Sequence, residues 1–152
     1  SDLGSGRGGS PAALQGREHM TTIPSTKLAA ADAYKMAGIT AKDVDFAEVH
    51  DCFTIAEVVD TEDLGFFEKG QGIQAVREGR TKLNSDISIN PSGGLKSKGH
   101  PIGATGVGQV VEVYDQLTGK AGARTVKDAK IGLTHNFGAT GASCAVHIFQ
   151  SV

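Results

Sequence analysis

Apolar residues recur at helical spacing in several segments of the chain, and the first of these segments is residues 25–37. The apolar residues at helical spacing are four alanines and one methionine: Ala29, Ala30, Ala33, Met36 and Ala37. Ser25 is a good N-cap, and Gly38 is typical of the position just after a helix. Because most of these apolar side chains are small, we expect a helix that packs closely against its neighbour.

Two more segments have helical periodicity. "TIAEVVDTEDLG" (residues 54–65) places Ile55, Val58 and Val59 on one face. A longer helix is predicted after the loop that ends at residue 106, with an apolar stripe at Val107, Val110, Val111, Tyr114 and Leu117 and with Gly119 just past its end. A short helix is predicted around residues 73–80. An apolar stripe of this kind is usually a buried face.

Four stretches read as strands: "VDFAEVH" (44–50), "DISIN" (86–90), "KIGLTHNF" (130–137) and "ASCAVHIFQ" (142–150). The last two are separated only by the Gly-rich "GATG", which predicts adjacent antiparallel strands. Cys144 alternates in phase with Val146 and Ile148, so we expect it in the core. Helices and strands in this order predict an α/β fold, a mixed β-sheet with helices packed on its faces.

Length and charge narrow the class of protein. A chain of 152 residues fits one domain with a real core, and a net charge of −2 without a basic cluster gives no sign of a nucleic-acid partner. No apolar run is long enough to cross a membrane. Only two cysteines and no secretory pattern favour a reducing compartment, so we expect a cytoplasmic protein.

The first 20 residues differ from the rest of the chain. They are rich in Gly and Ser, show no periodicity and end in His19-Met20. We expect residues 1–20 to be a disordered leader, tag or linker, and residues 21–152 to form the folded domain.

The candidate catalytic residues lie at or near the ends of predicted strands. His50 and Cys52 lie between a strand and a helix, His100 lies in a loop before a helix, and His135 lies near the end of a strand. Loops at one edge of a sheet could bring them together, and a thiol beside imidazoles would have a lowered pKa suited to nucleophilic or acid–base work. Each histidine taken alone is more often a hydrogen-bonded structural residue, and Cys52 alone is more often a buried apolar side chain; it is their joint placement at loop corners that favours a site.

Metal and nucleotide sites are the competing uses of these residues. A structural zinc site needs paired ligands, whereas this chain has one H-x-C and then isolated histidines, so we predict no metal site. The Gly-rich loop before residue 106 contains neither a phosphate-loop nor a dinucleotide-binding motif.

Three motifs resemble a known family. "AEVHDCFTIAE" (47–57), "NPSGGLKSKGHPIGATG" (90–106) and "HNFGATGAS" (135–143) look like the three C-terminal catalytic loops of the thiolases. They are most similar to those of the sterol-carrier-protein-type thiolases and the related bacterial and archaeal acetyl-CoA acetyltransferases. The resemblance runs from about Thr26 to Gln150.

The resemblance implies a role for each candidate residue. His100 would activate a nucleophilic cysteine that the N-terminal half of a thiolase supplies, and would help to bind the thioester oxygen. His50 takes the place of an asparagine that holds a water at an oxyanion site. His135 occupies the position of the usual acid–base cysteine, and Cys52 would take over that task in this subgroup.

The resemblance also implies the substrates and their contacts. Coenzyme A thioesters would be the substrates, with no cofactor beyond them. Candidate substrate-binding residues flank the three motifs: Phe53, Ser92, Gly93, Phe137 and Gly138. Backbone N–H groups in "FGATG" can face a developing enolate or oxyanion.

No part of the sequence resembles the N-terminal half of a thiolase, which holds the nucleophile. Cys144 cannot replace it, because its phase puts it within a strand. We therefore expect a C-terminal catalytic half, a cut domain or one of two chains, that is inert alone. It would need an N-terminal half as partner and would form a homo-oligomer at full length. The alternative is a non-catalytic structural or binding module that complements a partner chain.

Overall fold

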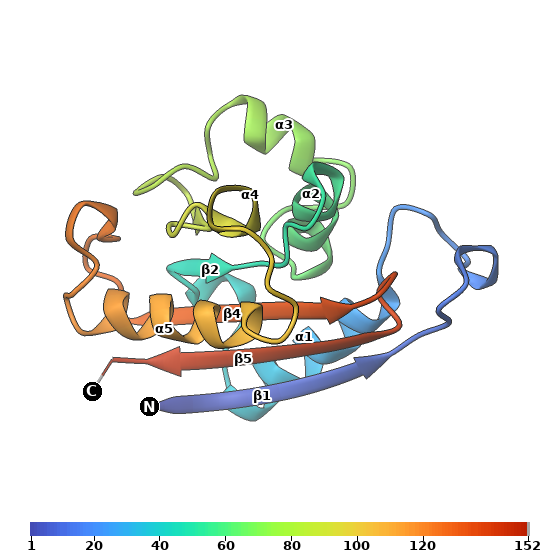
Figure 1. Ribbon diagram of the computed structural model, residues 1–152, viewed down its shortest axis with the longest axis horizontal. Helices are drawn as coiled ribbons and strands as arrows, with labels where there is room; N and C mark the ends of the chain where they lie inside the picture. The colour runs from blue at the N-terminus through green and yellow to red at the C-terminus, as the bar shows by residue number, and fades with distance from the viewer. Residues whose placement is uncertain (152) are drawn as a thin grey trace.

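A computed structural model describes residues 1–151, so Val152, the last residue of the predicted domain, lies outside the described residues. One mixed sheet contains five strands in the order β1-β5-β4-β2-β3 (Figure 1). The strands are β1 (Asp2–Gly9), β2 (Phe46–Glu48), β3 (Ser88–Ile89), β4 (Ile131–Gly138) and β5 (Ser143–Gln150). β5 pairs antiparallel with β1 and β4, whereas β2 pairs parallel with β3 and β4. The predicted mixed α/β fold is confirmed.

The helices are α1 (Pro24–Ala37), α2 (Thr54–Asp63), α3 (Gly72–Arg77), α4 (Gly94–Lys98) and α5 (Thr105–Leu117), with short 3-10 turns at Leu14–Gly16, Ala41–Asp43 and Gly122–Arg124. α1 packs behind β1 and β5, while α5 lies over β4 on the opposite face (Figure 1). None of the helices in residues 1–151 is long and apolar enough to span a bilayer. α1 starts one residue before the predicted cap, with Ile23 at the N-cap position, and α4 lies in a stretch that we predicted to be a loop.

The prediction that residues 1–20 are disordered is wrong for β1. This strand pairs with β5 along its length, from Asp2 to Gly9. Gly4, Gly6 and Gly8 of this strand lie against α1: a Cβ atom on Gly6 would be 2.0 Å from the carbonyl oxygen of Ala29, and one on Gly8 would be 1.9 Å from that of Ser25. β1 therefore has glycines in place of alternating apolar side chains, because a side chain at these positions would overlap α1. The same contacts confirm the prediction that α1 packs closely against its neighbour.

This contact predicts a difference between two glycines of one strand. Gly6→Ala should destabilise the fold by about 1–3 kcal/mol, because the new methyl group would overlap the backbone of α1. Gly9→Ala is the matched control, since its Cβ would meet only the carbonyl oxygen of Ala142, at 4.0 Å. Urea unfolding of both variants measures the difference. Equal midpoints would contradict the close packing of β1 on α1.

The main core lies between the sheet and α1. Its fully buried members include Ala29, Ala33, Val49, Leu133, Val146 and Ile148. Cys144 belongs to this core, as the alternation along β5 predicted. A smaller cluster on the other face of the sheet joins Phe46 to Val113 of α5 and Val126.

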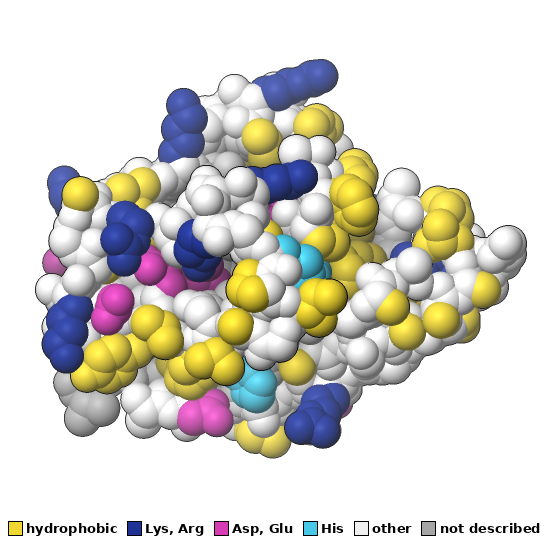
Figure 2. Space-filling model, in the orientation of Figure 1, with side chains coloured by type: hydrophobic (Ala, Val, Ile, Leu, Met, Phe, Trp, Pro, Cys, Tyr) yellow, Lys and Arg dark blue, Asp and Glu magenta, His cyan; other side chains and the backbone are white. Residues whose placement is uncertain are grey.

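Most of the apolar stripe predicted for α5 does not face the sheet, although Leu117 packs against the smaller cluster. Val107, Val111 and Tyr114 are 65%, 53% and 54% exposed, and apolar side chains gather along this helix in Figure 2. The buried face of α5 is instead mostly polar, with Val113 as its apolar member. Gln109 Nε2 donates to the backbone carbonyls of Glu48 and His135, at 3.3 and 3.0 Å. The helix was predicted correctly, but it turns its more polar side to the sheet, whereas a helix usually buries its apolar side.

Candidate active site

The three parallel strands bring the predicted motifs to one edge of the sheet. β2, β3 and β4 run in the same direction, so their carboxyl ends lie at the same edge. His50 follows β2, and the loop with His100 follows β3. The ring centroids of these two histidines are 4.9 Å apart, and Phe137 near the end of β4 lies 4.6 Å from His50. The predicted juxtaposition of these loops is confirmed.

His50 is a buried and neutral imidazole. Burial, and then the nearby charge of His100, lower the pKa of His50 to about 4, and the Asp51 carboxylate only partly opposes them. Its Nδ1 atom has no hydrogen-bond partner among the described residues. At pH 7 the ring is therefore uncharged and can donate or accept one hydrogen bond at the site.

His100 is exposed, and its ring orientation is set by a neighbour. Its Nδ1 lies 2.7 Å from Thr105 Oγ1, and this hydroxyl in turn lies 3.2 Å from the carbonyl oxygen of Pro101. Because the carbonyl can only accept, the hydroxyl proton goes to Pro101, and His100 Nδ1–H donates to Thr105. The Nε2 atom of the neutral ring then carries a free lone pair, which is what a general base needs.

Cys52 is half-buried at the start of α2, and the lowered pKa expected for it is wrong. Burial raises the pKa of the Cys52 thiol, and the carboxylates of Asp60 and Asp51 raise it further, against backbone hydrogen bonds that lower it. The neighbouring imidazoles do not reverse this balance, since His50 is uncharged. Cys52 is therefore in its protonated thiol form near neutral pH.

His135 lies behind the site. Its side chain is fully buried, with Nε2 2.9 Å from Thr26 Oγ1 and Nδ1 3.4 Å from the backbone N–H of His50. The Thr26 hydroxyl donates onward to Cys144 Sγ at 3.7 Å, which fits a neutral ring protonated on Nε2. Burial, and then His50, lower the pKa of His135 to about 3. Both ring nitrogens are engaged inside the protein.

The aromatic and glycine candidates flank the histidines. Phe53 follows Cys52 and is 69% exposed, whereas Phe137 is buried against His50. Gly138 is exposed at the end of β4. Phe53 and Gly138 are therefore open to a ligand, and Phe137 acts through its contact with the imidazole.

Ser92 and Gly93 form the turn before α4. Ser92 donates its N–H and its hydroxyl to the Glu48 carboxylate, at 3.0 and 2.6 Å. Gly93 has a φ of 94°, a left-handed conformation that favours glycine. Since the polar atoms of Ser92 are directed at Glu48, the turn has a structural function that the sequence did not reveal.

Two buried acids of the "EVHDCF" segment were missed by sequence reasoning. Glu48 holds Ser92, and Asp51 Oδ1 accepts the backbone N–H of Leu95 at 2.7 Å. The available signal was their position on either side of His50. Spacing alone could not show that both side chains turn inward to another loop.

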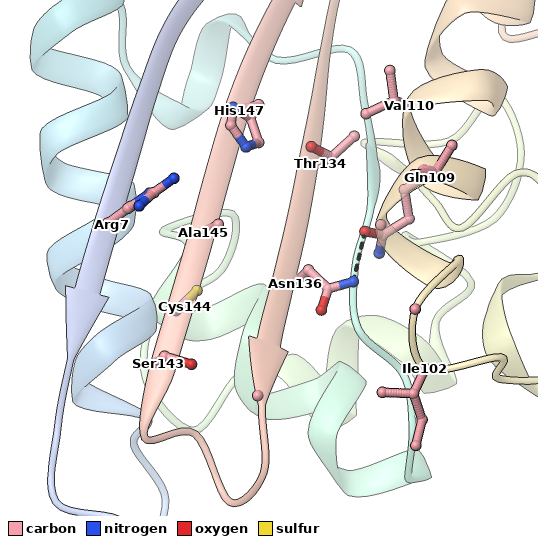
Figure 3. Close-up of a pocket in the computed structure, with 14 residues that line it drawn as sticks. Arg7, Ile102, Gln109, Val110, Thr134, Asn136, Ser143, Cys144, Ala145 and His147 are labelled. Carbon is pink, nitrogen blue, oxygen red and sulfur yellow. Dashed lines mark hydrogen bonds between the residues drawn. The ribbon is translucent and has the colours of Figure 1, made fainter.

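A groove of about 760 Å³ lies between α5 and the face of the sheet that α1 leaves open. Figure 3 shows Arg7, Asn136 and His147 along the strands, and Gln109 opposite them, with Asn136 Nδ2 3.2 Å from Gln109 Oε1. Neither His50, Cys52 nor His100 lines this groove. Within residues 1–151, no group of three or more His, Cys, Asp or Glu side chains is arranged to hold a metal.

Known proteins share both the sequence and the fold. Residues 6–151 match the family model described as "Thiolase C-terminal domain-like". The chain is 54% identical over 138 residues to a protein named acetyl-CoA acetyltransferase from Methanothermobacter thermautotrophicus, covering 91% of this chain and 36% of that protein. It is 46% identical over 123 residues to sterol carrier protein 2 from Homo sapiens, covering 81% of this chain and 22% of that protein.

A solved structure titled "Ltp2-ChsH2(DUF35) aldolase" superposes with a TM-score of 0.86 at 19% identity, covering 97% of this chain and 38% of that one. The chain thus spans about a third or less of the relatives it matches. The resemblance of the three loop motifs is confirmed by the match over nearly the whole chain, and the chain belongs to the family of thiolase C-terminal domains.

Proposed function

We propose that this chain is the C-terminal catalytic half of a thiolase-type acyltransferase, of the acetyl-CoA C-acyltransferase kind. It acts in the Claisen condensation or thiolytic cleavage of a 3-ketoacyl-CoA, with coenzyme A thioesters as substrates and no other cofactor. The observation that carries the proposal is the close pair of His50 and His100, 4.9 Å apart, with the Cys52 thiol two residues from the first. Relatives named acetyl-CoA acetyltransferase support it.

His100 is proposed to serve the first step, acyl transfer to a cysteine of the N-terminal half. Its Nε2 lone pair can take the thiol proton of that cysteine, which makes the thiolate that attacks the thioester. The imidazolium so formed can donate a hydrogen bond to the thioester oxygen. Thr105 keeps the ring in the tautomer that this step requires.

Cys52 is proposed to serve the carbon–carbon bond step. Condensation needs a base that removes a proton from the α-carbon of acetyl-CoA, and cleavage needs an acid that returns one. The raised pKa of Cys52 suits the acid in the cleavage direction, and its thiolate is the matching base for condensation. His50, neutral and next to it in the chain, is proposed to hold a water or substrate oxygen by a hydrogen bond.

The exposed apolar stripe of α5 supports the proposal that an N-terminal half binds to this chain. Val107, Val111 and Tyr114 line one side of the helix, and Ile102 just before it is 87% exposed. An apolar surface of this kind on one face usually marks a protein contact. We propose that the N-terminal half covers α5 and the neighbouring groove, in an enzyme that is a homo-oligomer at full length.

The function is tested by combining the two halves. The purified chain alone should neither form nor cleave acetoacetyl-CoA, because the nucleophilic cysteine that accepts the acyl group belongs to the N-terminal half. Joined to an N-terminal half, it should do both, as followed by the absorbance of acetoacetyl-CoA. The control is the same pair with the nucleophilic cysteine of the N-terminal half replaced by alanine, which should be inactive.

Two results would contradict the proposal. Turnover by the isolated chain that Cys144→Ala abolishes would make Cys144 a nucleophile. Full activity of the joined enzyme with both Cys52→Ala and His100→Ala would instead make this chain a non-catalytic module that completes the fold of its partner.

A further inference from the structure

The loop that carries His100 is fastened to the segment that carries His50 by two buried carboxylates. Glu48, two residues before His50, accepts both the N–H and the hydroxyl of Ser92. Asp51, directly after His50, accepts the backbone N–H of Leu95 at 2.7 Å and that of Lys96 at 3.4 Å. Both carboxylates are nearly without exposure to solvent. Hydrogen bonds from N–H groups to a buried carboxylate are strong, and they are costly to lose.

The backbone of the loop is shaped around Asp51. Gly94 has a φ of +65°, and a Cβ atom built on it would lie 2.3 Å from Asp51 Oδ2. A side chain at this position would therefore push the loop away from the carboxylate. Glycine here allows the Leu95 N–H to approach Asp51 directly.

The contacts form a short path from one histidine to the other. α4 begins at Gly94 and ends at Lys98, and the N–H of Gly99 bonds to the carbonyl oxygen of Leu95 at 3.0 Å. Only the rest of this short helix and Gly99 therefore separate the N–H groups that Asp51 accepts from His100. At the far side of the loop, Thr105 fixes the ring.

We propose that Asp51, with Glu48 as a second anchor, is a positioning residue that sets His100 beside His50. The side chain acts by accepting backbone N–H groups, and the shorter of its two contacts, with the Leu95 N–H at 2.7 Å, needs only one oxygen acceptor at this position. The catalytic meaning of this placement rests on the proposed function, whereas the placement itself is measurable without any substrate.

The test is a nuclear Overhauser cross-peak between the imidazole protons of His50 and His100 in the isotope-labelled chain. The cross-peak should be present in the wild type and in Asp51→Asn, which keeps an oxygen for the Leu95 N–H. It should be lost in Asp51→Ala. It should also be lost in Gly94→Ala, which decides the matter if Asp51→Ala does not fold.

Asp45→Ala is the matched control. Asp45 Oδ2 also accepts two backbone N–H groups, those of Lys130 and Ile131 at 2.7 and 2.9 Å, but at the start of β4, away from the site. Its variant should keep the cross-peak. Persistence of the cross-peak in folded Asp51→Ala or Gly94→Ala, or its loss in Asp45→Ala as well, would overturn the proposal. An absence of thiolase activity would leave this result unchanged and would count only against the proposed function.

Discussion

Replacing Cys52 with alanine in the enzyme joined to its N-terminal half is expected to slow condensation by about 10²–10⁴-fold, the usual contribution of a general acid or base. Acyl transfer to the nucleophile should stay close to the wild-type rate, because that step uses His100. Burial raises the pKa of the Cys52 thiol, so the residue is held in the protonated form that serves as the acid in cleavage, whereas condensation requires its thiolate.

Separate measurements of the two steps check this result. Mass spectrometry of the enzyme after brief mixing with acetyl-CoA counts the acylated protein, and formation of acetoacetyl-CoA reports condensation. Cys144→Ala is the control, since that thiol is buried in the core, where burial raises the pKa of Cys144 to about 12. Equal losses in acylation and condensation for Cys52→Ala would show that the residue supports the whole site rather than one step.

His100→Ala is expected to slow acylation itself, again by about 10²–10⁴-fold. Neither of the other two histidines can replace this imidazole as the base, because burial lowers the pKa of His50 to about 4 and His135 is enclosed. Rapid-quench measurement of acyl-enzyme formation gives the rate.

Thr105→Val provides a graded comparison for His100. It removes the acceptor of His100 Nδ1–H without removing the ring, so its loss should be smaller than that of His100→Ala. Acyl-enzyme formation at the wild-type rate in His100→Ala would contradict the assigned role.

Much of the fold could be predicted because its signals are local. Helical spacing indicated α1, α2 and α5, and a Gly-rich turn between two alternating segments indicated the β4–β5 hairpin. β1 could not be predicted in this way, because its glycines are needed for close contact with the backbone of α1, and that contact is not visible in the local sequence. The orientation of α5 was equally hidden, because periodicity shows that a helix has an apolar face but not what covers that face.

The candidate site was predictable in position and less so in chemistry. His50 and His100 follow two parallel strands, and they lie close together because the carboxyl ends of parallel strands lie at the same edge of a sheet. The pKa of Cys52 was expected to be lowered and is instead raised, because its burial and the nearby Asp60 carboxylate could not be deduced from the sequence. The burial of His135 behind His50 also depended on contacts with Thr26, more than 100 residues away.

Exchange of the α-protons of acetyl-CoA with deuterated water tests the assignment of the acid–base residue most directly. The measurement compares Cys52→Ala with His135→Gln in the joined enzyme, after circular dichroism has shown that both are folded. Because Cys52 lies at the site and both ring nitrogens of His135 are engaged inside the protein, Cys52→Ala should lose the exchange and His135→Gln should keep it. Exchange at the wild-type rate in Cys52→Ala, together with its loss in His135→Gln, would contradict the account.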